Sequence, residues 1–292
     1  MMLLTEQLNE THFSRSEREV ISFIEEEKEK IEDYSITYIA KKTYTSPSTL
    51  VRIAKKLGYS GWNDFKKDYL EEIHYLNSHF NDIDANTPFD EDESFMNIAY
   101  KIGQLHRESI EDTLSLINIE SLEKAIQLLL KAKRIHIMAI TNLIYAAEEL
   151  VFKFRRIGVD ARTYTDQYLL AEAYMIPKED CCIFISYSGQ TEPLLETAQI
   201  LKNKGVPLIA ITSIGDNTLS HLSNTSLYVT TREKSYKKIS AYTSLESIHL
   251  LMDILYSCYF RCNYDQNYKH KIKLAQLTES RQINNNIIKD EE

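Results

Sequence analysis

Residues 183–193 read IFISYSGQTEP, and this stretch decides the fold class of the second half of the chain. An apolar run that ends in small residues and leads straight into a helical pattern is typical of a buried strand followed by a helix. The same alternation recurs along the chain, with strands predicted at residues 134–140, 160–164, 180–188, 207–213 and 225–231. Strands that alternate with helices predict an α/β fold with a doubly wound parallel sheet.

The segment before residue 93 lacks this alternation and reads as an all-α bundle. Apolar spacing, serine caps, a proline at a first helical position and a glycine stop predict helices at about residues 14–30, 36–43, 47–57 and 63–76. We therefore expect two domains in the chain. The boundaries follow from the change of pattern: an all-α helix-turn-helix domain at 1–77, a polar linker at 78–92, the α/β domain at 93–265 and a polar tail at 266–292.

Composition excludes several classes of protein. The chain has 292 residues and a formal net charge of −9, and it has no apolar run long enough to span a bilayer. It starts without a basic segment and apolar core typical of a secretory signal, so we expect a cytoplasmic protein with no membrane partner. The spacing of its histidines and four cysteines does not resemble a zinc site, and neither metal nor cofactor is predicted.

Positive charge is concentrated in one part of this acidic chain. The window from residue 41 to residue 67 holds one acid, Asp64, and seven basic residues, Lys41, Lys42, Arg52, Lys55, Lys56, Lys66 and Lys67. A basic island of this kind is a candidate contact to a phosphate backbone. The alternative, an ordinary solvated helix face, remains open on charge alone.

Residues 35–57 have the arrangement of a helix-turn-helix, a short helix followed by a turn and a basic second helix. An arginine on the second helix can bond a guanine edge twice, and lysines can contact phosphates, which position a protein without specifying sequence. The expected outward face carries Ser46, Ser48, Thr49 and Arg52, with Lys55 and Lys56 placed for phosphates. Spacing alone leaves open a structural bundle that does not touch DNA.

The serine-rich loop after residue 185 is a candidate anion site. A strand that opens a helix directs backbone N–H groups and a helix N-terminus to one point, which favours negative charge. The candidate contacts are Ser186, Ser188, Gly189, Gln190 and Thr191. The loop holds no lysine or arginine and lacks the P-loop pattern, which fits a monophosphate better than a nucleoside triphosphate. A turn whose serines merely cap the next helix is the alternative.

Two stretches carry a resemblance to a known family. Residues 35–70, SITYIAKKTYTSPSTLVRIAKKLGYSGWNDFKKDYL, resemble the N-terminal domain of RpiR-type bacterial transcriptional regulators. Residues 184–213, FISYSGQTEPLLETAQILKNKGVPLIAITS, resemble the S-x-S-G-x-T signature of the SIS (sugar isomerase) domain. The resemblance covers both domains. It implies a DNA-binding regulator of carbohydrate metabolism, a homodimer or homotetramer on a palindromic operator, that senses a phosphorylated sugar or amino sugar.

The same resemblance assigns roles to the loop residues. It implies that Ser186, Ser188, Gln190 and Thr191 hold the phosphate while Gly189 sets the turn, with Thr212 and Ser213 lining the pocket. The family's first strand usually ends G-x-G-x-S, whereas residues 139–143 here read AITNL. Ala139, Thr141 and Leu143 therefore stand where Gly, Gly and Ser are expected, and Thr141 or Asn142 supplies the polar contact instead.

Three functional hypotheses remain at this stage. The first is the sensor just described, which needs no turnover, with the helices at 93–132 and 244–260 as assembly surfaces. The second is a phosphosugar isomerase or lyase that uses acid and base side chains, for which the candidates are Glu246, His249, Glu148 and Glu149. The third is a regulator whose degenerate pocket serves only for dimerisation. We favour the first, with Glu246 as a further ligand contact and no enzymatic activity.

Overall fold

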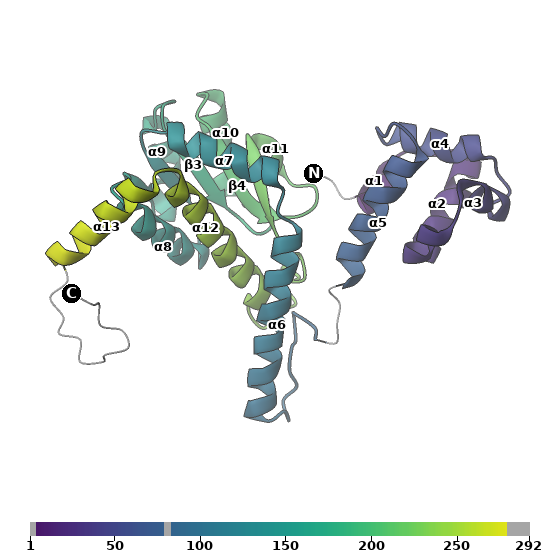
Figure 1. The fold of residues 1–292 in the computed structure, drawn as a ribbon, viewed down its shortest axis with the longest axis horizontal. Helices are drawn as coiled ribbons and strands as arrows, with labels where there is room; N and C mark the ends of the chain where they lie inside the picture. Colours follow the sequence, from purple (N-terminus) through teal and green to yellow (C-terminus); the bar gives the residue numbers. More distant parts are fainter. Residues whose placement is uncertain (1–3, 79–82, 279–292) are drawn as a thin grey trace.

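The computed structural model describes residues 4–78 and 83–278. Figure 1 shows a helical bundle before residue 79 and a larger α/β body after residue 94. The bundle consists of α1 (Leu4–Glu10), α2 (Arg15–Glu27), a 3₁₀ turn η1 (Lys28–Asp33), α3 (Ile36–Lys42), α4 (Pro47–Lys56) and α5 (Trp62–Ser78). All four helices predicted for this region are present as α2 to α5. Helix α1 is an additional element that the sequence reasoning missed.

The bundle closes over one apolar core to which every helix contributes. Its members include Leu8, Val20, Ile24, Ile39, Leu50, Ile53, Phe65 and Tyr69. Phe65 and Tyr69 are stacked, with ring centroids 5.7 Å apart, and both side chains are fully buried. This core holds one face of α4 against α2 and α5, while the opposite face of α4 stays exposed.

The α/β body contains a five-stranded sheet whose strands are all parallel. The strands are β1 (Ile135–Met138), β2 (Ala161–Thr163), β3 (Cys181–Ile185), β4 (Leu208–Ser213) and β5 (Thr225–Val229), in the order β2-β1-β3-β4-β5. The five predicted strands and the doubly wound parallel sheet are therefore confirmed.

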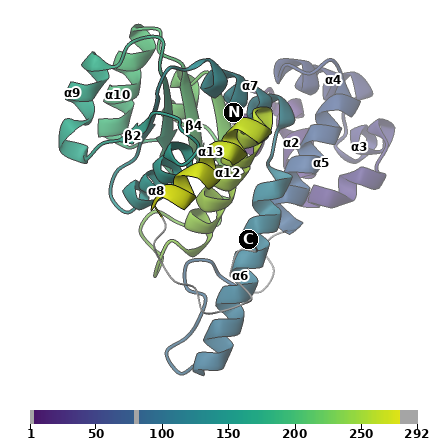
Figure 2. The ribbon, with the colours of Figure 1, turned by 60° about the vertical axis from the view of Figure 1, so that its left-hand side comes forward.

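Helices cover both faces of this sheet, as Figure 2 shows. Alternate residues of a strand point to opposite faces, so Ile183 and Ile185 pack under α7, α8 and α12 while Cys182 and Phe184 pack under α9, α10 and α11. The helices of this domain are α6 (Phe95–Ser115), α7 (Ile119–Lys131), α8 (Leu143–Arg155), η2 (Asp166–Tyr168), α9 (Leu169–Met175), α10 (Glu192–Asn203), α11 (Thr218–Leu222), α12 (Tyr242–Cys262) and α13 (Tyr264–Thr278). No helix within residues 4–78 and 83–278 is long and apolar enough to cross a membrane.

The linker and the tail differ from expectation in part. Ser78, the first residue of the predicted linker, still belongs to α5, and residues 83–92 form no helix or strand, but Ala85 is buried and Asn86 is hydrogen bonded to the α/β domain. The polar tail expected after residue 265 begins as helix α13, anchored where Asn267 Nδ2 donates to the Phe260 carbonyl at 3.0 Å. Polar composition alone did not reveal this helix. The rest of the predicted tail, after residue 278, lies outside the described residues.

Candidate functional site

The turn between α3 and α4 gives the bundle its helix-turn-helix. Ser35 caps α3 by accepting a hydrogen bond from Tyr38 N at 3.1 Å, and the turn closes through Thr45 N to the Ala40 carbonyl at 2.8 Å. Tyr44 adopts a left-handed conformation with φ 52° in this turn, and it is 98% exposed. Helix α4 then begins after Ser46 with Pro47 at its first position, as predicted.

The predicted DNA-contacting residues do not all lie on the outer face of α4. Ser46, Ser48, Arg52 and Lys55 are exposed, and the hydroxyls of Ser46 and Ser48 are 2.7 Å apart. Thr49, in contrast, is only 6% exposed, and its hydroxyl lies 3.2 Å from that of Ser46. The expectation that Thr49 faces outward is therefore wrong, because the helical turn places it beside the buried core residues Leu50 and Ile53.

A buried carboxylate on α2 holds two of the predicted basic residues. Glu17 is 1% exposed, and its Oε1 accepts from Arg52 Nε at 2.9 Å while its Oε2 accepts from Lys56 Nζ at 2.7 Å. Oε2 also accepts from Ser14 N at 2.8 Å, which caps the start of α2. Lys56 is further placed over the Phe13 ring. Lys56 is thus held to the bundle by Glu17 but stays exposed, as Lys55 does, so the predicted phosphate contacts of both lysines stay predictions.

The ionisation of Glu17 makes the bundle sensitive to acid. Burial acts to raise the pKa of Glu17, but the hydrogen bonds from Lys56, Ser14 and Arg52 outweigh it and lower the pKa from 4.5 to about 2. A carboxylate with a lowered folded-state pKa stabilises the fold above its unfolded pKa and loses that contribution as the pH falls. We expect Trp62 fluorescence, which reports on the bundle, to show a stability loss between about pH 4.5 and 2 that is reduced in Glu17→Gln. An equal loss in both proteins would contradict this assignment.

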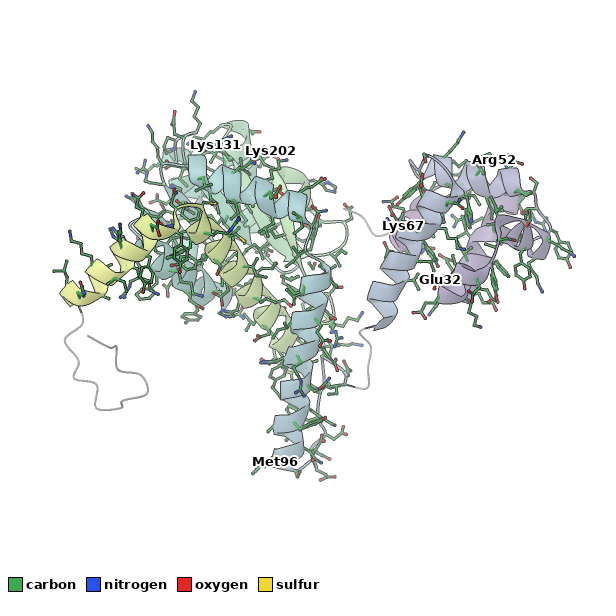
Figure 3. The ribbon with its side chains drawn as sticks, viewed as in Figure 1. Glu32, Arg52, Lys67, Met96, Lys131 and Lys202 are labelled. Atoms are coloured by element: carbon green, nitrogen blue, oxygen red, sulfur yellow. The ribbon has the colours of Figure 1, made fainter. Side chains whose placement is uncertain are left out.

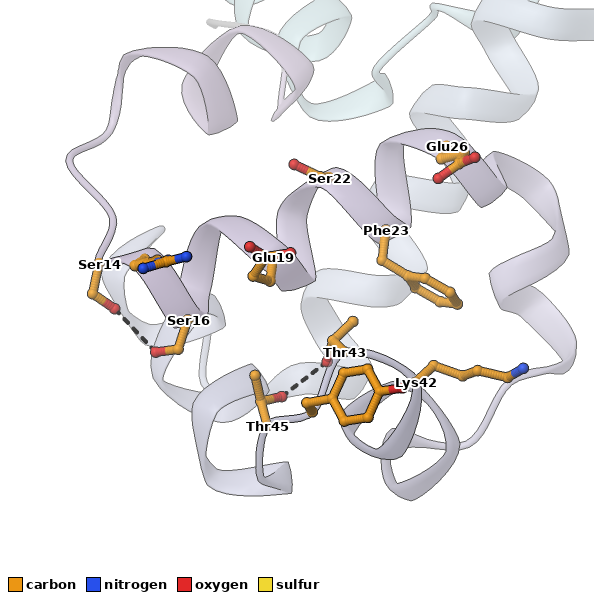
Figure 4. A pocket seen from close by; sticks show the side chains of 11 residues that line it. Ser14, Ser16, Glu19, Ser22, Phe23, Glu26, Lys42, Thr43 and Thr45 are labelled. Carbon is orange, nitrogen blue, oxygen red and sulfur yellow. Dashed lines mark hydrogen bonds between the residues drawn. The ribbon is translucent and has the colours of Figure 1, made fainter.

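A groove of about 850 Å³ runs between α2 and the helix-turn-helix turn, as Figure 4 shows. Its lining mixes polar, apolar and charged side chains of both signs, namely Ser14, Arg15, Ser16, Glu19, Ser22, Phe23, Glu26, Lys42, Thr43, Tyr44 and Thr45. Figure 3 labels Arg52 on α4 of the same bundle. Arg15 and Tyr44 are candidate contacts that the sequence reasoning missed, because the pattern around residue 14 was read only as a helix cap.

The serine-rich loop brings its candidate residues together in one tight turn. Ser186 is buried at the end of β3, and its hydroxyl lies 2.9 Å from that of Thr191, the residue before α10. Ser188 Oγ accepts from Gln190 N at 3.2 Å, and Gln190 Oε1 accepts from Thr218 Oγ1 at 2.8 Å. Hydroxyl and amide groups therefore gather at the N-terminus of α10, where an anion is favoured.

Gly189 is required by this turn for two reasons. Its φ is 61°, a left-handed conformation that L residues rarely adopt, and a Cβ on it would lie 2.1 Å from Asn217 Oδ1. Asn217 in turn caps α11, since its Oδ1 accepts from Ser220 N at 2.9 Å. The serine loop and the start of α11 therefore pack directly against each other at Gly189, the loop position that lacks a side chain.

The loop after β1 lies at the same edge of the sheet as the serine loop. Strands β1 and β3 are parallel neighbours in the order β2-β1-β3-β4-β5, in which β2 lies on one side of β1 and the later strands lie on the other. Ligands of open α/β sheets bind at the carboxyl ends of strands at such a switch point. Thr141 and Asn142, both exposed, follow β1 there, and Ser186 to Thr191 follow β3. The two sets of predicted contacts therefore share one edge.

Thr141 stands where the family resemblance predicts a glycine, and its backbone adopts a left-handed conformation. Its φ is 55°, and a β-branched residue in this region is strained. We expect Thr141→Gly to raise the free energy of unfolding of the α/β domain by about 1 kcal/mol, measured by urea denaturation followed by circular dichroism. Thr165→Gly is the matched control, because Thr165 has an ordinary φ of −74° and glycine there should destabilise. A loss of stability in both variants would disprove the strain.

Glu246 and His249 do not form the acid–base pair considered from the sequence. Glu246 Oε2 lies 3.5 Å from His106 Nδ1 on α6, whereas His249 Nδ1 lies 3.0 Å from Glu149 Oε2 on α8. The two side chains thus engage different helices, and His249 instead meets Glu149, another of the acid and base candidates named from the sequence. Glu246 has its ion-pair partner on α6 and makes no hydrogen bond or ion pair with the serine loop within the described residues, which does not support its predicted role as a ligand contact.

The loop between β5 and α12, residues 230–241, supplies charged groups that the sequence reasoning missed. Tyr187, between the two candidate serines, donates its hydroxyl to the Glu233 carbonyl at 3.0 Å. Lys238 Nζ lies 5.1 Å from the centre of the Tyr187 ring and 2.8 Å from Glu233 Oε2. The charged run REKSYKK, residues 232–238, follows the last strand and could have revealed this loop from the sequence. The carboxyl ends of parallel strands lie at one edge of a sheet, so this run is expected near the serine loop.

Glu233 anchors this loop to α12. Its Oε1 accepts from Thr243 N at 2.6 Å and from Ser244 N at 3.0 Å, which satisfies the start of the helix. Burial acts to raise the pKa of Glu233, but hydrogen bonds from Lys238, Ser244 and Thr243 outweigh it, so the pKa is lowered. The carboxylate is therefore charged, and it keeps Lys238 beside Tyr187.

The chain resembles known proteins over nearly its whole length. Residues 2–74 match the helix-turn-helix domain of the rpiR family, and residues 128–256 match the SIS domain. An uncharacterized HTH-type transcriptional regulator of Clostridium perfringens is 30% identical over 275 residues, which cover 93% of this chain and 97% of that protein. A second uncharacterized HTH-type transcriptional regulator, from Caldanaerobacter subterraneus, is 24% identical over 94% of this chain and 95% of its own length.

Solved structures share the fold. The Vibrio vulnificus NanR protein complexed with ManNAc-6P is 23% identical, with a TM-score of 0.58 over 94% of this chain and 97% of that chain. The sugar isomerase domain of an RpiR transcription factor from Sphaerobacter thermophilus is 13% identical, with a TM-score of 0.56 over 62% of this chain and 99% of that chain.

Proposed function

The chain belongs to the RpiR family of helix-turn-helix transcriptional regulators that carry a SIS domain, and we propose that it binds operator DNA and senses a phosphorylated sugar or amino sugar. The observation that carries the proposal is the serine loop, in which hydroxyls and an amide surround a helix N-terminus at the switch point of the sheet. The NanR relative of similar fold was solved with ManNAc-6P, a phosphorylated amino sugar. The proposal thus assigns DNA binding to the helix-turn-helix domain and phosphosugar binding to the SIS domain.

DNA binding is assigned to the exposed face of α4. Arg52 is our base-reading residue, and Lys55, with Ser46 and Ser48, contacts phosphates. Arg52→Ala should weaken binding to the preferred duplex by about 1–3 kcal/mol and relax base preference, whereas Lys55→Ala should weaken binding to all duplexes alike and lower the salt slope by about 1. Fluorescence anisotropy with a duplex enriched from a random pool measures both effects. Equal behaviour of the two variants would remove the reading role of Arg52.

Ligand sensing is tested by thermal stability. A panel of hexose and amino-sugar phosphates is added to the full chain, with the same sugars lacking phosphate as controls. Free ligand at about 100 times its Kd stabilises the fold by about 2.7 kcal/mol. We expect one phosphosugar to act on the wild type and on Ser121→Ala, a serine outside the loop, but not on Ser188→Ala. A flat response to every phosphosugar would leave only the dimerisation hypothesis for this domain.

We assign no turnover to the chain. Glu246 and His249 do not pair, and the candidate pair that does form, His249 with Glu149, makes no hydrogen bond to the serine loop within the described residues. The support for binding without turnover is the attached helix-turn-helix domain, because a regulator needs no chemical step. Incubation with the stabilising phosphosugar and inspection of the sugar by NMR tests this. Appearance of an isomer at a rate proportional to protein concentration would instead support the isomerase or lyase.

The regulator is proposed to act as a homodimer or homotetramer on a palindromic operator. Two-fold symmetry of the protein would match half-sites separated by about one helical turn of DNA or a multiple of it. The N-terminal half of α6 exposes Phe95, Met96 and Tyr100, and Met96 is labelled near the end of that helix in Figure 3. Light scattering of the full chain, with and without the enriched duplex, gives the stoichiometry.

Coupling between ligand and DNA is proposed to run through the β5–α12 loop. This loop holds Tyr187 of the ligand site through Glu233, and it holds the linker through Asn86. Lys234 N donates to Asn86 Oδ1 at 2.7 Å, and Ile239 N donates to the Asn86 carbonyl at 2.8 Å. A ligand that shifts Tyr187 therefore shifts the segment that leads to the DNA-binding domain.

Asn86→Ala should uncouple DNA binding from phosphosugar binding. We expect each affinity to stay within about twofold, while the factor by which the phosphosugar changes DNA affinity, ordinarily 5–150-fold, falls toward one. Anisotropy titrations of DNA with and without the phosphosugar measure the factor. Asn203→Ala, on the exposed end of α10, is the control. An unchanged factor in Asn86→Ala would exclude this route.

A further inference from the structure

Glu17 accepts more hydrogen bonds than a helix cap requires. The capping role uses only the bond from Ser14 N to Oε2. Yet the same carboxylate is buried and accepts charged donors from two residues of α4, Arg52 and Lys56, on a helix 35 residues further along the chain. The carboxylate that starts α2 is thereby tied to the proposed reading residue of α4.

The bond to Glu17 restricts how Arg52 can present its guanidinium. Nε is held at 2.9 Å from Oε1, while the side chain remains 56% exposed. No hydrogen bond joins either Nη group to another residue in the described part of the chain. A guanidinium is planar, so one charge-assisted bond at Nε sets the plane in which the Nη donors lie. Those Nη groups are the donors that would form hydrogen bonds to the acceptors of a guanine edge.

Glu17 also removes positive charge from the DNA-binding face. Arg52 and Lys56 lie within 3 Å of a carboxylate whose pKa is about 2, so one of their two charges is balanced at neutral pH. Sequence-independent binding to DNA rises with the number of phosphates neutralised. A nearby fixed anion therefore lowers the attraction to every sequence, while the oriented Nη donors of Arg52 strengthen binding only where a guanine edge accepts them.

We propose that Glu17 is a positioning and specificity-determining residue for DNA recognition. It orients Arg52 for a base edge before DNA arrives, and it lowers the attraction of the bundle to unrelated DNA. The proposal rests on the proposed function, because it assumes that α4 reads DNA. It assigns a role to a residue that lies outside the helix-turn-helix itself.

Glu17→Gln tests the charge while leaving the cap, because glutamine also serves at this position of a capping box. Glu25→Gln is the matched control: Glu25 is partly exposed on the same helix and does not line the groove beside the helix-turn-helix, and replacing it with glutamine makes the same change in net charge. Full-length variants are titrated by anisotropy with the enriched duplex and with a scrambled duplex of equal composition, over a series of salt concentrations. Thermal melts monitored by Trp62 fluorescence confirm that the bundle is folded.

We expect Glu17→Gln to bind scrambled DNA more tightly, with a salt slope steeper by about 1, and to lose about tenfold in the ratio of enriched to scrambled affinity. Glu25→Gln should leave that ratio unchanged. A ratio that is unchanged in Glu17→Gln, or that falls equally in both variants, would overturn the proposal. If the wild type itself does not prefer the enriched duplex, the proposed function fails instead.

A second measurement needs no variant and covers the case in which Glu17→Gln does not fold. In the wild type, the Arg52 Nε–H signal in a nitrogen–proton NMR spectrum should be resolved and protected from exchange with water, both free and bound to the enriched duplex. Loss of that protection in the complex would mean that Arg52 leaves Glu17 to bind DNA, which contradicts the positioning role.

Discussion

Arg232→Met is expected to lower the free energy of unfolding of the α/β domain by about 3–5 kcal/mol, the largest effect of any single change considered. Arg232 is buried in the β5–α12 loop, where its Nε donates to Asp112 Oδ2 at 2.6 Å and its Nη1 donates to Glu108 Oε2 at 2.5 Å. Both carboxylates belong to α6 and are buried themselves. Removing the cation leaves two buried charges without their main partner, whereas the methionine preserves most of the volume.

Urea denaturation with two probes measures this loss. The chain has one tryptophan, Trp62, which lies in the bundle, so tryptophan fluorescence reports on the bundle while circular dichroism reports on both domains. The variant should shift the transition seen by circular dichroism and leave the fluorescence transition in place. Arg162→Met is the control, because its pair with Asp160 is exposed and such pairs contribute about 0–1 kcal/mol. Equal losses in the two variants would contradict the importance of burial here.

Gly189→Ala is expected to destabilise the α/β domain by about 2–3 kcal/mol and to abolish the response to phosphosugar. The backbone strain of a left-handed alanine accounts for part of the loss. The rest arises because the new Cβ would lie 2.1 Å from Asn217 Oδ1, which forces Asn217 away from the start of α11. The serine loop and its hydroxyl groups shift with it.

Gly205→Ala separates strain from collision. Gly205 also has a positive φ, 75°, but a Cβ there meets no atom within 4 Å. It should lose only about 1–2 kcal/mol from backbone strain and should keep the thermal response to phosphosugar. If Gly189→Ala retains that response, the turn is not part of the ligand site, because the collision cannot leave the loop in place.

Much of the fold could be predicted from local pattern. Apolar runs that alternate with helical spacing identified all five strands, and Ser46, Pro47 and Gly58 marked the ends of α4 close to where they are. These signals are local because a strand's burial and a helix's caps depend on residues within a few positions. The serine loop was found for the same reason, since its hydroxyls, glycine and helix start lie within six residues.

Errors occurred where orientation within an element mattered. Thr49 was placed on the outer face of α4, although the helix turns it inward. Glu246 and His249 were paired because they are three residues apart, a spacing that puts two side chains on neighbouring positions of a helix. In the molecule each contacts a residue on another helix, which spacing along α12 cannot reveal.

By itself, then, the order of residues determined the two domains, the parallel sheet, the helix-turn-helix and the composition of the serine loop. Only the tertiary structure decided that Glu17 meets Arg52, that Glu233 meets Tyr187 and that Asn86 of the linker meets the β5–α12 loop. The physical reason is that a charge or hydrogen-bonding group is satisfied by whichever partner packing brings within about 3 Å. Partners far apart in the chain leave no local signal of that choice.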